Sequence, residues 1–185
     1  MTRGTTRYAV WLFAVNVGGN NKVPMAWLRQ AATDAGFTDV ATYLQSGNLV
    51  LSSSANEADV RDRIAGLIRD GLGLEIEVTV RSRAELAKVI ARNPMPQHLD
   101  EPSRLHVSFL TGKPDAAGVG AIDPAPFAPD EFAVDGQQIY LWFPAGAGRS
   151  KLATLPWRKK IGVAGTARNW RTVLAVLDLL DSVGG

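Results

Sequence analysis

The order of strand-like and helix-like segments in the first 81 residues limits this chain to few folds. An eight-residue apolar run at 8–15 is typical of a central strand that is covered on both faces. A polar loop then leads to Pro24, which suits the first turn of a helix because proline lacks the N–H that is unpaired there. Two short strands at 40–45 and 48–52 follow, and we expect a tight two-residue turn at Ser46-Gly47 to join them.

A second helix and a fourth strand complete this order. Apolar residues at helical spacing occupy 60–68, and apolar residues alternate with polar ones over 76–80. The resulting order, β-α-β-β-α-β, is the ferredoxin-like split βαβ arrangement. Ser82 and Glu85 have the spacing of a capping box, so we expect a further helix to begin directly after this strand.

The second half of the chain repeats part of the same order. A strand at 105–109, a short helix near 115–121 and a hairpin that turns at Asp135-Gly136 give β-α-β-β. A final helix is expected over 167–182, with Thr166 as its N-cap and with Trp170, Leu174 and Leu177 on one face. We therefore predict an α+β protein of two ferredoxin-like subdomains, with mainly antiparallel sheets and a C-terminal helix. The subdomains are expected at 1–92 and 104–185, with a proline-rich linker at 93–103.

Composition excludes several classes of chemistry. The chain has 185 residues, no cysteine and two histidines, so thiol catalysis, zinc–thiolate sites and iron–sulfur clusters are ruled out. His98 and His106 belong to no evident triad or metal-ligand grouping, so we assign no catalytic residue and expect no metal and no cofactor. The apolar run at 8–15 is far shorter than the ~20 residues that span a bilayer, so we expect a cytoplasmic protein without a membrane segment.

Charge is distributed unevenly along the chain. Residues 136–177 contain seven Lys or Arg and no acid, whereas residues 34–135 contain nine basic and sixteen acidic residues. A basic segment of this density can bind phosphate, carboxylate or nucleic acid, or it can pair with the chain's own acidic middle.

Strand connectivity brings two polar loops together. In a split βαβ sheet, the end of the first strand and the turn between the second and third strands lie at the same edge, so we expect these loops to touch. Glycine N–H groups, a helix N-terminus and a lysine at one rim favour an anion. The residues concerned are Asn16, Gly18, Gly19, Asn20 and Lys22 in the first loop and Gln45, Ser46, Gly47 and Asn48 in the second.

The basic segment supplies two further groups to this predicted ligand site. Arg149, Ser150 and Lys151 form a glycine-flanked turn, and Thr166, Arg168 and Asn169 are expected at the start of the last helix. Trp157, beside three basic residues, is a candidate for stacking on a nucleic-acid base. For the loops, the alternative is that Gly, Asn and Ser are there for turn geometry alone.

Several of these motifs resemble those of domain-of-unknown-function family 1697. The motifs are Asn16 to Met25, Gly36-Phe37, Thr42 to Asn48, Ser150-Lys151-Leu152 and Thr166 to Trp170, within a resemblance that runs from about residue 8 to 178. The family usually has Arg-Gly or Arg-Ala where this chain has Phe13-Ala14, so any anion contact made by that arginine is absent here. The resemblance implies a plait-like α+β fold but supplies no activity.

Three functions stay open at this point. The first is binding of a small anionic ligand at the polar loops, with or without catalysis. The second is binding of RNA or single-stranded DNA, for which the aromatic ribonucleoprotein signatures are missing. The third is a protein-interaction or dimerisation unit, and no oligomeric state is assigned.

Overall fold

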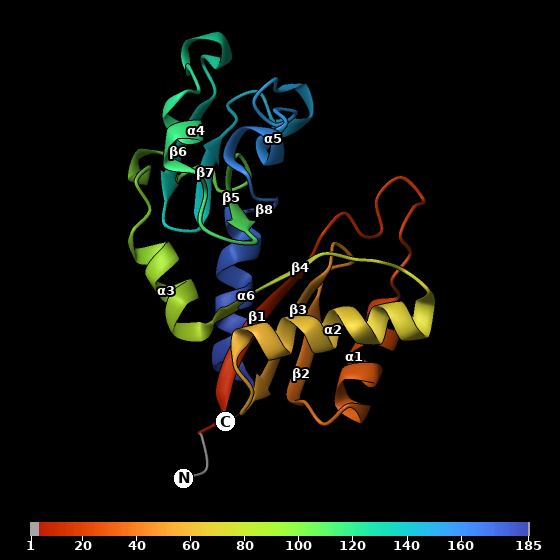
Figure 1. Cartoon of the computed structure of the whole chain (residues 1–185). Helices are drawn as coiled ribbons and strands as arrows, with labels where there is room; N and C mark the ends of the chain where they lie inside the picture. The colour runs from red at the N-terminus through yellow and green to blue at the C-terminus, as the bar shows by residue number, and fades with distance from the viewer. Residues whose placement is uncertain (1–3, 185) are drawn as a thin grey trace. The chain divides into compact units, whose positions relative to one another are not determined.

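The computed structural model of the chain describes residues 4–184, which form two compact units (Figure 1). The first unit contains residues 4–90 and 174–184, and the second contains residues 91–173. Each unit is built on its own four-stranded sheet.

The first unit has the predicted β-α-β-β-α-β order. Its antiparallel sheet has the strand order β2-β3-β1-β4, which is that of a ferredoxin-like plait. A further helix, α3, follows β4 directly. The elements are β1 Thr6–Leu12, α1 Met25–Asp34, β2 Thr38–Tyr43, β3 Asn48–Ser53, α2 Glu57–Leu72, β4 Val78–Ser82 and α3 Arg83–Ala91.

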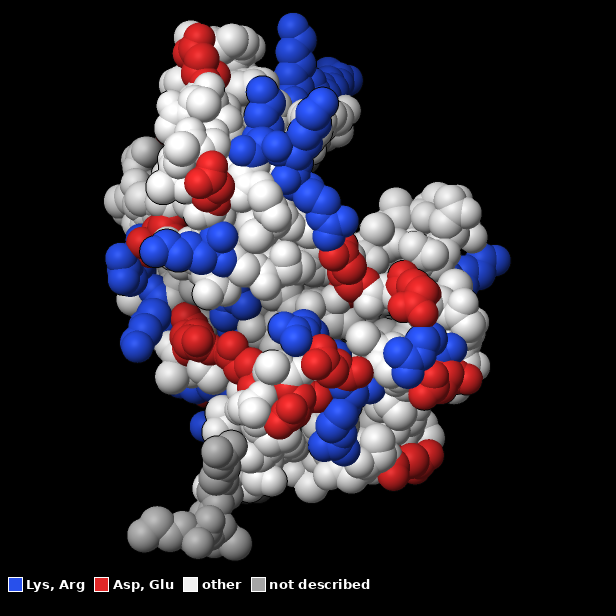
Figure 2. Space-filling model, viewed as in Figure 1, with Lys and Arg blue, Asp and Glu red and all other residues white. Residues whose placement is uncertain are grey.

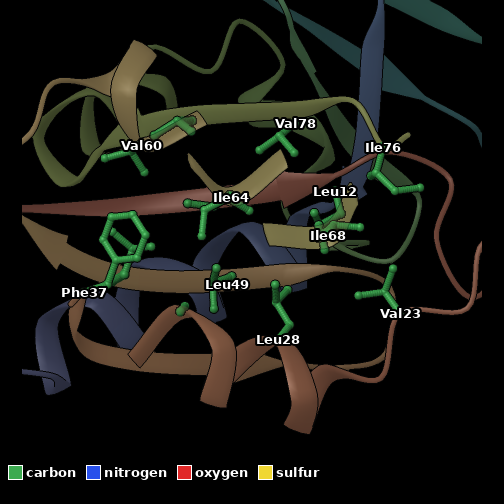
Figure 3. Close-up of a cluster of buried hydrophobic side chains, with 14 of the residues drawn as sticks. Leu12, Val23, Leu28, Phe37, Leu49, Val60, Ile64, Ile68, Ile76 and Val78 are labelled. Carbon is green, nitrogen blue, oxygen red and sulfur yellow. The ribbon is translucent and has the colours of Figure 1, made fainter. Parts of the chain in front are cut away.

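Helices α1 and α2 cover one face of this sheet. Leu28 of α1 and Ile64 of α2 pack with Leu12 and Leu49 of the central strands in one buried cluster (Figure 3). Alternate residues of β1 point into this cluster because side chains of a strand alternate between the two faces of the sheet. The apolar spacing over 60–68 therefore predicts the buried face of α2 correctly.

Local signals set the ends of these helices. The Asn56 side chain caps α2, and Gly73 ends it in the left-handed conformation. The predicted capping box is confirmed: the Ser82 N–H donates to Glu85 Oε2 at 2.8 Å, and the Glu85 N–H donates to Ser82 Oγ at 3.2 Å. The predicted two-residue turn is wrong, because Tyr43 pairs with Asn48 and the connection therefore has four residues, 44–47.

The second unit has the same topology, which the sequence predicts only in part. Its sheet order is β6-β7-β5-β8, so the complete β-α-β-β-α-β order is present twice. The basic segment, expected to be a loop and a helix start, contains the missing helix α5 and strand β8. The elements are β5 Leu105–Leu110, α4 Ala116–Gly120, β6 Glu131–Asp135, β7 Gln138–Trp142, α5 Trp157–Ile161 and β8 Gly165–Asn169.

The last helix, α6 (Trp170–Ser182), differs from its prediction at the cap and on the buried face. Thr166 lies inside β8, and the cap is Asn169, whose Oδ1 accepts from the Thr172 N–H at 3.0 Å. The buried residues are Trp170, Thr172, Val173, Val176 and Leu180, whereas Leu174 is 38% exposed.

Residues 174–184 of α6 and its end belong to the first unit, although the second subdomain was expected to extend to the end of the chain. Arg7 of β1 donates to the Leu180 carbonyl at 2.7 Å, and Arg83 pairs with Asp181 at 2.8 Å, which fixes this end of the helix to the first unit. Within residues 4–184, no helix is long and apolar enough to cross a membrane.

Candidate functional site

The first polar loop is a small hairpin with an exposed glycine tip. The Asn16 N–H donates to the Asn21 carbonyl at 3.1 Å, and the Asn20 N–H donates to the Val17 carbonyl at 3.2 Å. Gly18 and Gly19 at the tip have φ of 61° and 80°, the two positive values that a type I′ turn requires. Glycine is therefore needed at both positions for the backbone.

Asn16 fixes this hairpin to the second loop. Its Nδ2 donates to the carbonyls of Gln45 at 2.7 Å and Val23 at 2.9 Å, and its Oδ1 accepts from the Val23 N–H at 2.9 Å. The prediction that the two loops touch is confirmed. Asn16 itself is a positioning residue, because both hydrogens of its amide are used within the loops.

The second loop, residues 44–47, is held by its own ends. The Leu12 N–H donates to the Gly47 carbonyl at 2.9 Å, and Asn48 donates to the Tyr43 carbonyl at 2.8 Å and to Ser46 Oγ at 3.1 Å. Gly47 and Asn48 are buried, whereas Gln45 and Ser46 are exposed. Leu44 is exposed too, so Gln45 and Ser46 are the exposed polar residues through which this loop can meet a ligand.

Backbone strain is concentrated at this rim. Five non-glycine residues of the described chain have positive φ, and four of them, Ala14, Asn16, Asn21 and Leu44, lie in or beside the two loops. The left-handed conformation is tolerated by Asn but costs about 1–2 kcal/mol for other L-residues, and it is unusual for a side chain as large as leucine. Strain of this kind is common at functional sites.

The rim carries positive potential. Helix α1 begins directly after Pro24, has no acidic residue in its first turn, and is capped by no side chain of the described chain. Its first N–H groups therefore stay open to solvent or to an anion. Lys22 is exposed two residues before the proline and forms no ion pair with residues 4–184.

The site residues predicted in the basic segment belong to the second unit. Arg149 and Lys151 are exposed on either side of the buried Ser150. The Ser150 hydroxyl donates to Asp130 Oδ2 at 2.6 Å and accepts from the Ala153 N–H at 3.0 Å, so it is used within this turn. Only the two basic residues of this group are open to a partner.

The group around Arg168 is mostly buried rather than at a ligand-facing helix start. Arg168 lies in β8, and its Nη1 donates to Thr166 Oγ1 at 2.7 Å and to the Ala167 carbonyl at 2.9 Å. Burial lowers the pKa of Arg168 to about 10. The predicted ligand residues thus form a contacting pair of loops in the first unit and two groups in the second, of which one is exposed and one buried.

The first unit contains a counterpart of Arg168 that the sequence did not indicate. Arg81 in β4 donates to Thr79 Oγ1 at 3.1 Å and to the Val80 carbonyl at 2.7 Å. Arg81 faces Ala9 of β1, as Arg168 faces Val107 of β5, and both strands end at the capping residue of a helix. A search for Thr-x-Arg before a capping residue would have found this repeat.

A pair of carboxyl groups beside Arg81 is a second feature missed from the sequence. Glu57, at the start of α2, and Glu85, in the first turn of α3, are hydrogen-bonded to each other, and the Ser82 N–H donates to Glu57 Oε1 at 3.1 Å. Burial, and then Glu85, raise the pKa of Glu57 to about 7. Burial also acts on Glu85, but its hydrogen bonds from Glu57 and Ser82 outweigh this and lower its pKa. The pair therefore shares one proton near neutral pH.

A family model described as "Protein of unknown function (DUF1697)" matches residues 5–140. The chain belongs to this family. The match covers the part of the first unit before residue 91 and continues into β7 of the second unit, and it ends before the Ser150–Leu152 and Thr166–Trp170 motifs that contributed to the resemblance.

The fold of this chain is also found in a solved structure. The chain is similar to the conserved bacterial protein SP0830 from Streptococcus pneumoniae, with 22% identity and a TM-score of 0.76. The similarity covers 96% of this chain and 99% of that one, so both units are shared. At this identity the likeness concerns the fold. No curated protein matches the chain.

Proposed function

We propose that the DUF1697 chain binds a small anionic ligand at the rim formed by the two polar loops of the first unit. The observation that carries this proposal is the use of both Asn16 amide hydrogens: one donates to the Gln45 carbonyl in the turn at 44–47, and the other donates to the Val23 carbonyl just before α1. The ligand would meet the glycine backbone, the open N–H groups of α1 and the Lys22 ammonium, all of which favour negative charge.

Each exposed group at the rim has a distinct role in this proposal. Lys22 neutralises the ligand, and Gln45 and Ser46 orient it through their amide and hydroxyl groups. Asn16 and Asn48 hold the loops in place through bonds to backbone and to Ser46.

Turn chemistry alone accounts less well for this rim. Turns would favour Gly or Asn at left-handed positions, yet Ala14 and Leu44 occupy two of them with φ of 48° and 58°. Leu44 is also 56% exposed, so it gains little from burial that could offset the strain. A ligand contact that needs the loops in this conformation would explain why the strain is retained.

Thermal-shift screening followed by calorimetry tests the proposal. The probes are inorganic phosphate, nucleotides, sugar phosphates and short dicarboxylates. Binding at a hundredfold excess over Kd stabilises a protein by about 2.7 kcal/mol, which is a readily measured rise in Tm. Loss of one charge-assisted hydrogen bond of about 1.5–3 kcal/mol predicts that Lys22→Gln weakens binding about tenfold to a hundredfold.

The matched control is Lys88→Gln, because Lys88 is an exposed lysine on α3 of the same unit. The proposal fails if no probe stabilises the protein, or if Lys22→Gln and Lys88→Gln bind a stabilising probe equally well.

A further inference from the structure

We infer that the second unit binds the phosphate backbone of a nucleic acid through five exposed basic residues on and around α5. Lys159 and Lys160 lie on α5, Lys113 precedes α4, and Arg149 and Lys151 flank the turn before α5. This surface is separate in residues and in chemistry from the proposed small-anion rim of the first unit. Figure 2 shows Lys and Arg side chains gathered over α5.

The charge of this surface is not neutralised within the chain. All five residues are exposed, and none forms an ion pair with any residue of the described range 4–184. Other exposed arginines, such as Arg61 and Arg69, do form ion pairs, with Asp62 and Asp70 at 2.9 Å. The alternative that the basic block pairs with the acidic middle of the chain therefore does not account for the four of these residues that lie in that block, Arg149, Lys151, Lys159 and Lys160.

The basic segments share one supporting core. Leu152, which follows Lys151, is buried in the same cluster as Ile161, which follows Lys160. Lys113 lies close to the end of α5, because the Asp115 N–H donates to the Ile161 carbonyl at 2.9 Å and Gly118 packs tightly on the Lys160 carbonyl. The basic residues are thus exposed around one buried core.

The chemistry of this surface fits a chain of phosphates better than a lipid surface. In residues 104–173, no large hydrophobic side chain is exposed, so nothing on this part of the described chain can insert between lipids. Trp157 packs edge-on against Phe132 in the buried cluster of the second unit, with 5.5 Å between the ring centroids. It therefore supports the core rather than serving as a base-stacking platform. Recognition is therefore of the phosphate backbone, without strong sequence preference.

Salt dependence of binding measures this interaction directly. Each neutralised phosphate contributes about −0.7 for a single strand and −0.9 for B-DNA to the slope of log K against log salt. Five contacts therefore predict a slope of about −3.5 to −4.5. Replacing two of the basic residues should make this slope shallower by about 1.4–1.8 and weaken binding to all sequences alike.

The experiment measures fluorescence anisotropy of labelled single-stranded RNA and duplex DNA with the full chain, between about 50 and 200 mM salt. The test variants are Lys159→Gln/Lys160→Gln and Arg149→Gln/Lys151→Gln. The control is Arg61→Gln/Arg69→Gln, which removes the same two charges from exposed arginines that already have acid partners in the first unit. Circular dichroism checks that all variants keep the fold.

The expected result is salt-dependent binding of at least one nucleic acid, a shallower slope for each test variant, and an unchanged slope for the control. The inference is overturned if neither nucleic acid binds at the lowest salt, or if the test variants and the control have the same slope. Binding to vesicles with anionic lipids in the absence of nucleic-acid binding would also overturn it, in favour of a membrane surface.

Discussion

The carboxyl pair in the first unit makes the stability of this DUF1697 protein depend on pH in a direction that can be calculated. Near neutral pH, the protonated Glu57 donates to the Glu85 carboxylate, while the Ser82 N–H donates to Glu57 Oε1 at 3.1 Å. Glutamine can reproduce this arrangement, since its amide donates to Glu85 and its carbonyl accepts from Ser82. Glu57→Gln therefore fixes the pair in its protonated form.

The sign and size of the effect follow from the pKa of Glu57, which the fold raises from 4.5 to about 7. The folded state holds the Glu57 proton more tightly than the unfolded state. The contribution of this proton to the free energy of unfolding is therefore fully present below about pH 4.5 and is lost as pH rises through about 7. At 1.36 kcal/mol per pKa unit the full loss is about 3.4 kcal/mol. Glu57 is only half-buried, and solvent screening reduces the expected loss to about 1–1.5 kcal/mol.

The assay is urea unfolding followed by tryptophan fluorescence at several pH values from about 5 to 8. Glu57→Gln should match the wild type at the acid end and exceed its stability by about 1 kcal/mol at the alkaline end. Glu75→Gln, at an exposed glutamate of the same unit, is the control and should show no such divergence. A constant difference between Glu57→Gln and the wild type across this pH range would refute the shared proton.

Three further predictions concern packing and capping, and each is measured by the change in the free energy of unfolding in urea. Gly47→Ala should cost about 2–4 kcal/mol, because the residue has positive φ and its new Cβ would lie 2.7 Å from Val15 Cγ2. Gly18→Ala also places a side chain at positive φ but has open space around it, so it should cost only about 1 kcal/mol. Equal costs would contradict the tight packing of the second loop. Asn169→Ala should cost about 1 kcal/mol by removing the cap of α6. Thr166→Val should cost about 1–2 kcal/mol by removing an acceptor of the buried Arg168.

Elements with strong local signals were predictable from the sequence. The apolar run that becomes β1 is central in its sheet, and the Ser82-Glu85 spacing predicts the start of α3. The contact between the two loops of the first unit was also predictable, because it follows from strand connectivity alone. The strand and the helix start depend on local periodicity and capping, whereas the loop contact depends on the order in which the strands are connected.

Helix α5 and strand β8 were not predictable in the same way. The Trp157–Ile161 helix has five residues and three consecutive cations, so it shows no apolar periodicity. Buried and exposed residues alternate along β8, but one of the buried residues is Arg168. Because this residue is charged, the strand shows no alternation of apolar and polar residues in the sequence. Both elements are held in place by tertiary packing, which overrides weak local preference.

The roles of the amide side chains also depend on tertiary contacts. Sequence position alone assigns Asn16, Asn48 and Asn169 equally well to ligand contacts or to turns, because one amide serves both purposes. The hydrogen bonds decide between these roles: Asn16 joins two loops, Asn48 closes a turn and Asn169 caps a helix.

The repeat of Thr-x-Arg at the same register in both sheets gives each sheet the same local support for a buried arginine. Thr79 and Thr166 face Trp11 and Phe109 at matching positions of the two central strands, and each accepts a hydrogen bond from the arginine two residues later. A buried arginine is costly unless its donors are satisfied, and the threonine and the intervening carbonyl satisfy two of them within the same strand. Each fourth strand therefore carries its own support for a buried charge. The exposed cations that we propose to bind anions, Lys22 and those around α5, lie outside these strands and can be replaced without disturbing this internal support.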